Sequence, residues 1–179
     1  MKRPIYFITR QKEWDLLQIL MLNVDCSNFN SSDTGVLMVS PDYSATVAMH
    51  LAHTWSKDGK MIDIIPVEVP YPNPVNTPTT PMCQMQLRNL IGNRLTKYRK
   101  LVLVEAGVIS GKNYQWILEE LYACGRYTKK NVTTVALCES VNSITKSDYV
   151  AEYYDDQKEE LAFYYERFNI NWHSTSPSI

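Results

Sequence analysis

Hydrophobic residues in this chain alternate between short continuous runs and runs with helical spacing. The continuous runs predict strands, and they are PIYFIT (4–9), GVLMVS (35–40), MIDIIPVEV (61–69), KLVLVE (100–105) and NVTTVALCE (131–139). The helical pattern covers QKEWDLLQILMLNV (11–24), ATVAMHLAHTW (45–55), MCQMQLRNLIGNRLTKYR (82–99) and NYQWILEELYACG (113–125). Apolar strands that alternate with helices are typical of an α/β fold. We therefore predict a mainly parallel sheet with helices on both faces.

No linker in the chain is long enough to divide it into separate domains. We predict a single domain over residues 1–179, with its core at about 33–150. The prolines of PYPNPVNTPTTP (70–81) exclude a helix interior or a central strand, so a flexible loop is expected at about 66–81. The aromatic and acidic segment 151–179 is expected to pack irregularly beside the sheet, as a small C-terminal hood.

Composition excludes several classes of protein. With 45% hydrophobic and 21% charged residues, the 179-residue chain is neither disordered nor membrane-spanning, and no uninterrupted apolar run of membrane length or signal-peptide core is present. We expect a cytoplasmic protein with no membrane partner. The four cysteines form no CxxC pair, which favours buried thiols over a zinc site or disulfides. The net charge of −1 disfavours nucleic-acid binding through a globally basic surface.

Two turns are expected to carry the chemistry, because ligands of open parallel sheets lie beyond the carboxyl ends of the strands. The first turn is SPDYS (40–44), and the second is EAGVISGKN (105–113). In the second, Gly107 and Gly111 permit unusual backbone angles, while free helix amides and Lys112 offer an anion site. Neither a GxxxxGK[ST] loop nor GxGxxG is present, so a purely structural turn is the alternative.

The segment LVLVEAGVISGKNY (101–114) resembles the signature of type I phosphoribosyltransferases, in which a strand ends on two adjacent acids and an Asp-Thr-Gly-Lys-Thr-like loop follows. The segment KSDYVAEYYDDQKEELAFYYE (146–166) resembles the C-terminal part of the xanthine-guanine-like branch of that family. The order of the remaining elements also fits the family. The resemblance implies a phosphoribosyltransferase-like fold that spans most of residues 33–166.

The resemblance also implies a ligand and a set of site residues. In the family, a nucleobase displaces pyrophosphate from phosphoribosyl pyrophosphate in the presence of Mg2+, and the enzymes are commonly dimers. By matching position, Glu105 is the expected catalytic and ribose-binding acid. The residues implied to hold the phosphate and ribose are Glu105, Ala106, Gly107, Ser110, Gly111, Lys112 and Asn113; those of the pyrophosphate loop are Ser40, Asp42 and Tyr43; those against the base are Tyr149 and Val150. No protein-held metal is expected.

Several positions depart from the family pattern. Ala106 replaces the second acid, and Ile109 replaces the aspartate that accepts a proton from the base. Asp42 stands in a loop that is expected to hold pyrophosphate, and Glu139 stands where a lysine is expected to meet the base. These changes favour ligand binding over the ordinary salvage reaction.

Two functional hypotheses follow from the sequence. The first is a phosphoribosyltransferase-like protein that binds a ribose 5-phosphate ligand and transfers a pentose group to an atypical nucleobase. The second is a catalytically degenerate protein of that fold, which senses a nucleotide or binds a macromolecule. The basic stretch Arg88–Lys100 permits a nucleic-acid surface, although a solvated helix face is favoured. The acidic run Glu152–Glu160 has the opposite charge and permits a homodimer in which the two runs meet.

Overall fold

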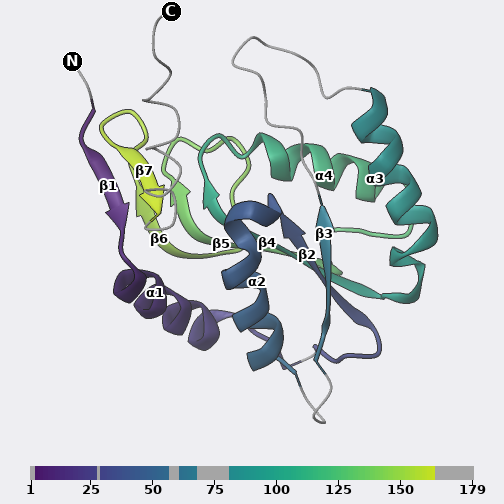
Figure 1. Ribbon diagram of the computed structural model, residues 1–179. Helices are drawn as coiled ribbons and strands as arrows, with labels where there is room; N and C mark the ends of the chain where they lie inside the picture. The colour runs from purple at the N-terminus through teal and green to yellow at the C-terminus, as the bar shows by residue number, and fades with distance from the viewer. Residues whose placement is uncertain (1–2, 28, 57–60, 68–80, 164–179) are drawn as a thin grey trace, which may run out of the picture.

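A computed structural model describes residues 3–27, 29–56, 61–67 and 81–163, with the backbone alone at 41–43 and 81–85. Its main feature is a five-stranded parallel sheet (Figure 1). The strand order is β3-β2-β4-β5-β6. These strands span Asp63–Val67 (β3), Thr34–Val39 (β2), Lys100–Val108 (β4), Val132–Ser140 (β5) and Tyr149–Tyr154 (β6). A separate parallel pair joins β1 (Ile5–Ile8) to β7 (Glu160–Phe163).

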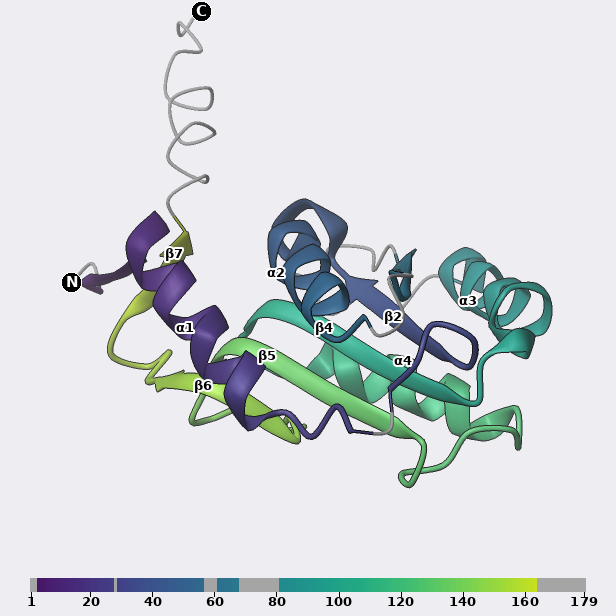
Figure 2. The same ribbon diagram turned by 90° about the horizontal axis from the view of Figure 1, so that it is seen from below.

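Helices cover both faces of the sheet, as the sequence pattern predicts. On one face lie α1 (Arg10–Asn23) and α2 (Pro41–Thr54), while α4 (Lys112–Ala123) lies on the other (Figure 2). The helix α3 (Pro81–Asn93) and the short 3-10 helix η1 (Leu95–Lys97) share their hydrophobic core with α4. In the part of the chain that the structure describes, no helix is both long and apolar enough to cross a membrane.

Alternate residues of the central strand β4 supply two hydrophobic cores. Val102 and Val104 pack with α1 and α2, around the fully buried ring of Trp55. Leu101 and Leu103 pack in the opposite core, with α3 and α4. Because successive side chains of a strand point to opposite faces, a strand covered on both faces is apolar at nearly every position. The continuous run KLVLV is the sequence pattern of such a strand.

The fold class is confirmed, and three details differ from the prediction. Strand β4 continues to Val108, so Ala106 and Gly107 belong to the strand and not to the turn. The helix predicted over 82–99 ends at Asn93, and η1 follows it. Helix α1 packs in the first core, although it precedes the expected core at 33–150.

The C-terminal segment is more regular than predicted. Strand β6 completes the main sheet beside β5, and β7 pairs with β1 from the other end of the chain. The irregular packing expected after residue 150 is therefore wrong for 151–154 and 160–163, which are strands. Most of the expected proline-rich loop and the end of the hood, residues 68–80 and 164–179, lie outside the described residues.

The strand order indicates at which edge of the sheet a ligand is expected to bind. From β2 the chain proceeds outward to β3, whereas β4, β5 and β6 succeed one another in the opposite direction. The order therefore reverses between β2 and β4, and ligands of open α/β sheets bind at such a point, beyond the carboxyl ends of the strands. Met38 of β2 pairs with Val104 of β4, so Ser40, which follows β2, lies next to Glu105 in the last part of β4.

Candidate functional site at the carboxyl ends of β2 and β4

Glu105 is the centre of a polar cluster at the point where the strand order reverses. Its Oε1 atom accepts a hydrogen bond from Nδ2 of Asn113 at 3.0 Å and a longer one from Oγ of Ser40 at 3.4 Å. Ser40 precedes α2, and Asn113 lies in the first turn of α4. The cluster thus joins the ends of two strands to the starts of two helices, and it unites three of the predicted site residues.

Burial changes the acidity of Glu105. Only 6% of the residue is exposed, and the loss of hydration raises the pKa of its carboxyl from 4.5 to about 7. The hydrogen bonds from Asn113 and Ser40 act in the opposite direction, since they favour the charged form. A carboxyl with a pKa near neutrality can either accept a hydrogen bond from a sugar hydroxyl or hold a proton, depending on pH.

The backbone of the first turn is strained at Ser40. Its φ of 51° lies in the left-handed region, which a residue with a side chain rarely adopts. Ser40 is the N-cap residue of α2, but its side chain makes no capping bond and bonds to Glu105 instead. Four residues later, the buried Ser44 accepts a hydrogen bond at 3.0 Å from the amide of Ala106. These bonds fix the first turn against the end of β4.

The second turn exposes the groups that an anion needs. Ser110 and Lys112 are exposed, and Gly111 is the N-cap of α4 with a φ of 74°. The first helical amide with an acceptor inside this helix is that of Gln115, which donates to the carbonyl of Gly111 at 3.0 Å. Of the amides before it, that of Lys112 donates a long hydrogen bond of 3.4 Å to Oγ of Ser110, and the helix dipole favours negative charge at this helix end.

Gly111 is held closely by the loop that connects β5 to β6. A Cβ atom at Gly111 would lie 2.4 Å from Oγ of Ser143 and 2.7 Å from the amide nitrogen of Thr145. The amide of Ile144 donates to the carbonyl of Ser110 at 3.0 Å. The second turn is thus supported from outside by residues of the 141–148 segment.

Solved structures of similar fold are known, although the sequence matches no protein-family model and no curated protein. One is a purine phosphoribosyltransferase from Pyrococcus horikoshii Ot3, which has a TM-score of 0.62 and 15% identity, over 99% of this chain and 98% of that one. Another is the xanthine-guanine-hypoxanthine phosphoribosyltransferase of Helicobacter pylori, with a TM-score of 0.63 and 14% identity, over 97% of this chain and 99% of that one. The chain has the type I phosphoribosyltransferase fold.

A third neighbour has the same fold. It is a hypothetical protein from Neisseria gonorrhoeae, solved with bound ppGpp, with a TM-score of 0.64 and 13% identity, over 97% of this chain and 95% of that one. At these identities the likeness concerns the fold alone. Since each match spans nearly the whole of both chains, the resemblance predicted from two motifs extends to the complete architecture.

The other predicted site residues lie apart from the Glu105 cluster. Ala106 is fully buried in the first core, and Gly107 lies under β7, where an added Cβ would be 2.9 Å from Cδ2 of Leu161. Tyr149 and Val150 are partly buried in β6, and Val150 lies two strands from Glu105, beyond Ala136. The backbone of residues 42–43 lies in the first turn of α2, which keeps the predicted pyrophosphate loop at the same edge of the sheet.

Two positions at which the family resemblance implies functional side chains carry different residues here. The side chain of Ile109 is 54% exposed at the end of β4, and it cannot accept a proton. Glu139, which stands at the expected position of a lysine, is fully buried at the end of β5. Among the side chains that the structure describes, Glu105 is therefore the carboxyl at the reversal point between β2 and β4.

The residues of this edge do not fit a metal held by the protein. Across the part of the chain that is described, no three His, Cys, Asp or Glu side chains gather into a metal-binding group. Mg2+ favours carboxylate and phosphate oxygens, but the oxygen of Glu105 that is already bonded receives the amide protons of Asn113. The described side chains, which do not include that of Asp42, therefore form no magnesium site at this edge.

The predicted basic surface is divided between several contacts. Arg88 pairs with Glu120 through two hydrogen bonds of 2.8 and 3.2 Å, and Lys97 pairs with Asp63 at 2.6 Å. Since α3 ends at Asn93, the basic residues do not share one helix face. A pocket of about 450 Å³ beside Arg94 and Lys97 lies at the amino-terminal ends of β3 and β4, away from the candidate site.

The residues that support the site from the outside are not recognisable in the sequence. In the sequence, Ser44 is visible only as the last residue of the SPDYS turn. In the structure, its hydroxyl accepts a hydrogen bond from the amide of Ala106 on the neighbouring strand. The loop residues Ser143, Thr145 and Lys146 follow the end of β5 and contain no motif that indicates a contact with the second turn. Only the parallel pairing of β5 with β6 brings that loop to Gly111.

Proposed function

We propose that the protein binds a phosphorylated ribose, either phosphoribosyl pyrophosphate or a nucleotide, at the carboxyl ends of β2 and β4. The turn of Ser110, Gly111, Lys112 and Asn113, in which Ser110 and Lys112 are exposed, holds the 5′-phosphate through backbone amides and the lysine charge. Glu105 accepts a hydrogen bond from a ribose hydroxyl. Ser40 and the backbone of residues 42–43 contact a second anionic group at the start of α2.

One observation carries this proposal. The buried carboxyl of Glu105 lies between the amino-terminal ends of α2 and α4, and it is bonded to a residue from each turn. An acid flanked by two anion-attracting helix ends suits a ligand that has sugar hydroxyls between phosphate groups. The phosphoribosyltransferase fold of the chain supports this choice of ligand.

Transfer of the pentose to a nucleobase is the finer version of this proposal. The reaction needs the anomeric carbon to be presented to an acceptor, and positioning supplies much of the rate enhancement. Mg2+, which binds phosphate oxygens readily, enters with the phosphates of the ligand, since the described side chains form no metal-binding group. The acceptor is atypical, because Ile109 offers no base to remove a proton from a purine nitrogen.

A second candidate function is nucleotide binding without turnover. The observation that favours it is the loss of acids at Ala106 and Ile109, which leaves the phosphate-binding groups in place. The Neisseria gonorrhoeae neighbour, described with bound ppGpp, supports a nucleotide as the ligand. Release of pyrophosphate from phosphoribosyl pyrophosphate, assayed with a panel of nucleobases, distinguishes the two functions: release supports transfer, and its absence alongside tight nucleotide binding supports the second function.

Replacement of Lys112 by alanine tests the phosphate turn. We expect about tenfold weaker binding of guanosine monophosphate, because one charged contact to the phosphate is lost. Isothermal titration calorimetry, with and without Mg2+, measures the affinity. Lys130→Ala is the matched control, since Lys130 is exposed and precedes β5 at the opposite edge of the sheet. If the wild-type protein binds neither this nucleotide nor phosphoribosyl pyrophosphate, the proposal is wrong.

The homodimer stays a prediction. Within the chain, Lys12 pairs with Glu152 and Lys158 pairs with Asp155, so part of the acidic run is already neutralised. A dimer formed by the remaining charges is expected to dissociate as salt is added, because screening weakens exposed charge pairs. Light scattering at low and high ionic strength measures this, and a monomer under both conditions would contradict the prediction.

A further inference from the structure

The loop that joins β5 to β6, residues 141–148, is an unusual crossover. Parallel neighbours in a sheet are usually joined by a dozen or more residues that include a helix. Here a short loop returns the chain from Ser140 to Tyr149, which pairs with Val135 near the middle of β5. The loop therefore folds back along the carboxyl end of the sheet, beside the second turn.

Three contacts join the tip of this loop to the second turn. The amide of Ile144 donates to the carbonyl of Ser110, and Gly111 leaves no room for a side chain beside Ser143 and Thr145. The loop tip is braced internally, because Oγ of Ser143 donates to the carbonyl of Thr145 at 2.8 Å. Any shift of the tip is thus transmitted directly to Ser110 and Gly111.

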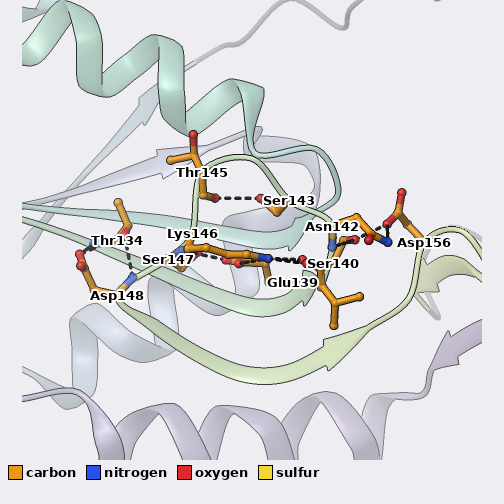
Figure 3. A network of polar contacts seen from close by, with 11 residues as sticks. Thr134, Glu139, Ser140, Asn142, Ser143, Thr145, Lys146, Ser147, Asp148 and Asp156 are labelled. Atoms are coloured by element: carbon orange, nitrogen blue, oxygen red, sulfur yellow. Dashed lines mark hydrogen bonds and ion pairs between the residues drawn. The ribbon is translucent and has the colours of Figure 1, made fainter.

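Lys146 ties this loop to the end of β5. Its Nζ atom donates to the carbonyls of Ser140 and Val141, each at 2.9 Å, and lies 3.5 Å from Oε1 of Glu139. Figure 3 shows the Lys146 side chain running beside Glu139 toward Ser140. The ammonium thus neutralises the carboxylate and cross-links the two limbs of the loop.

Glu139 is the buried partner in this tie, and its Oε1 atom, 3.5 Å from the ammonium, makes no hydrogen bond. It is fully buried, and its Oε2 atom accepts a hydrogen bond from the amide of Ser147 at 2.8 Å. A buried carboxylate that loses its partner costs several kcal/mol, so the surrounding backbone rearranges to hydrate it. Lys146 and the amide of Ser147 are therefore both needed to keep the loop closed over Glu139.

Two further bonds anchor the ends of the loop. At one end, Nδ2 of Asn142 donates to Asp156 at 2.8 Å. At the other, Asp148 accepts from the amide of Thr134 at 2.8 Å (Figure 3). Between these ends, the amide of Ser143 donates to the carbonyl of Ser140 at 3.1 Å, and Lys146 ties the limb that follows the tip to residues 139–141.

We infer that Lys146 is a positioning residue for the second turn: by holding Glu139 and the 141–148 loop, it fixes Ser110 and Gly111 in the conformation that receives a phosphate. This inference rests on the proposed function for its ligand. It does not require Lys146 to touch the ligand, because the ammonium is directed at Glu139 and at two backbone carbonyls.

Amide hydrogen exchange of the second turn tests the inference without a ligand. In Lys146→Met, we expect the amide of Ile144, which donates to the carbonyl of Ser110, and that of Gln115, which donates to the carbonyl of Gly111, to exchange about tenfold faster, while the amides of β4 keep their protection. Lys146→Arg preserves the charge and is expected to restore most of the protection. Lys130→Met, an exposed substitution at the other edge of the sheet, is the matched control and is expected to change nothing at the turn.

A second variant covers the case in which Lys146→Met does not fold. The double variant Glu139→Gln, Lys146→Met removes the buried charge together with its partner, so that no unpaired carboxylate remains. It still lacks the bonds to the carbonyls of residues 140 and 141, and its second turn is expected to exchange faster than in the wild-type protein. Wild-type exchange at this turn in every folded variant that lacks Lys146 would overturn the inference.

Titration with guanosine monophosphate separates the two proposals. Lys146→Met is expected to weaken the affinity about tenfold, while Lys146→Arg is expected to bind nearly as well as the wild type. If the wild-type protein binds no ribose phosphate, the proposed function fails, but the exchange experiment still decides whether Lys146 positions the turn. If the nucleotide binds equally well to the wild type and to Lys146→Met, the role of Lys146 in ligand binding is wrong while the site itself stands.

Discussion

Replacing Gly111 by alanine is expected to destabilise the protein by about 3 kcal/mol, of which 1–2 kcal/mol comes from the left-handed backbone and the rest from crowding. The φ of 74° places Gly111 in the region that disfavours a Cβ atom. The added methyl group would also lie 2.4 Å from Oγ of Ser143 and 2.8 Å from the carbonyl oxygen of Thr145. We expect the 141–148 loop to move and phosphate binding to be lost with it.

Gly125→Ala is the matched control for this prediction. Gly125 has a φ of 72°, but nothing lies within 4 Å of the position that its Cβ atom would take. Gly125→Ala is therefore expected to lower the free energy of unfolding by about 1 kcal/mol, which is the cost of the left-handed backbone alone. Urea denaturation of both variants gives the two free energies of unfolding. Equal losses would show that the contact between Gly111 and the loop is not tight.

Replacing Glu105 by glutamine is expected to stabilise the protein at pH 8 by about 3 kcal/mol, because each unit of pKa shift corresponds to about 1.4 kcal/mol. Burial raises the pKa of this carboxyl from 4.5 to about 7, so the folded protein holds the proton more tightly than the unfolded chain. Below pH 4.5 the Glu105 carboxyl is protonated in both the folded and the unfolded protein, so its burial as a charge costs no stability. As the pH rises from 4.5 to 7 the wild-type protein loses stability, and above 7 the penalty is constant.

Denaturation of the wild type and of Glu105→Gln across pH 4 to 8 measures this difference. The stability gap is expected to open between pH 4.5 and 7. Glu119→Gln, at an exposed position of α4, controls for general loss of charge. The same Glu105 variant is expected to bind guanosine monophosphate at least tenfold more weakly at pH 8, since it loses a charged acceptor for the ribose hydroxyl. A constant gap at every pH would mean that Glu105 is not the group that titrates.

The fold and the main groups of the site could be predicted from the sequence. Four of the five predicted strand runs, and the helical spacing between them, are strong signals because these strands lie in the main sheet, whose two faces are covered; the fifth run, PIYFIT, contains β1, which pairs with β7 instead. The sequence predicts Glu105 and Asn113 at one site because the apolar strand run ends at Glu105 and the helical pattern begins at Asn113, although β4 itself continues to Val108. The hydrogen bond between them follows from that geometry.

The end of β4 was harder to predict. Ala106 and Gly107 resemble turn residues in sequence, yet the strand continues because β5 offers partners as far as Glu139. Gly107 is required by the close approach of Leu161 and Phe163 in β7, and not by its backbone angles. No local pattern reveals a contact between residues that are more than fifty positions apart.

The C-terminal strands were missed for a related reason. The segment YVAEYY is only partly buried, so its residues lack the continuous apolar pattern of β4 and β5. Strand β7 is four residues long and depends on β1, from the start of the chain, for its pairing. Short edge strands are defined by their partners more than by their own composition.

In the proposed function, a ribose phosphate binds between Glu105 and the second turn. The most direct test is a crystal structure of the protein soaked with guanosine monophosphate. We predict phosphate density at the amides of residues 111–113, close to Lys112, with a ribose hydroxyl within hydrogen-bonding distance of Glu105. A nucleotide bound elsewhere, with its phosphate away from this turn, would contradict the account.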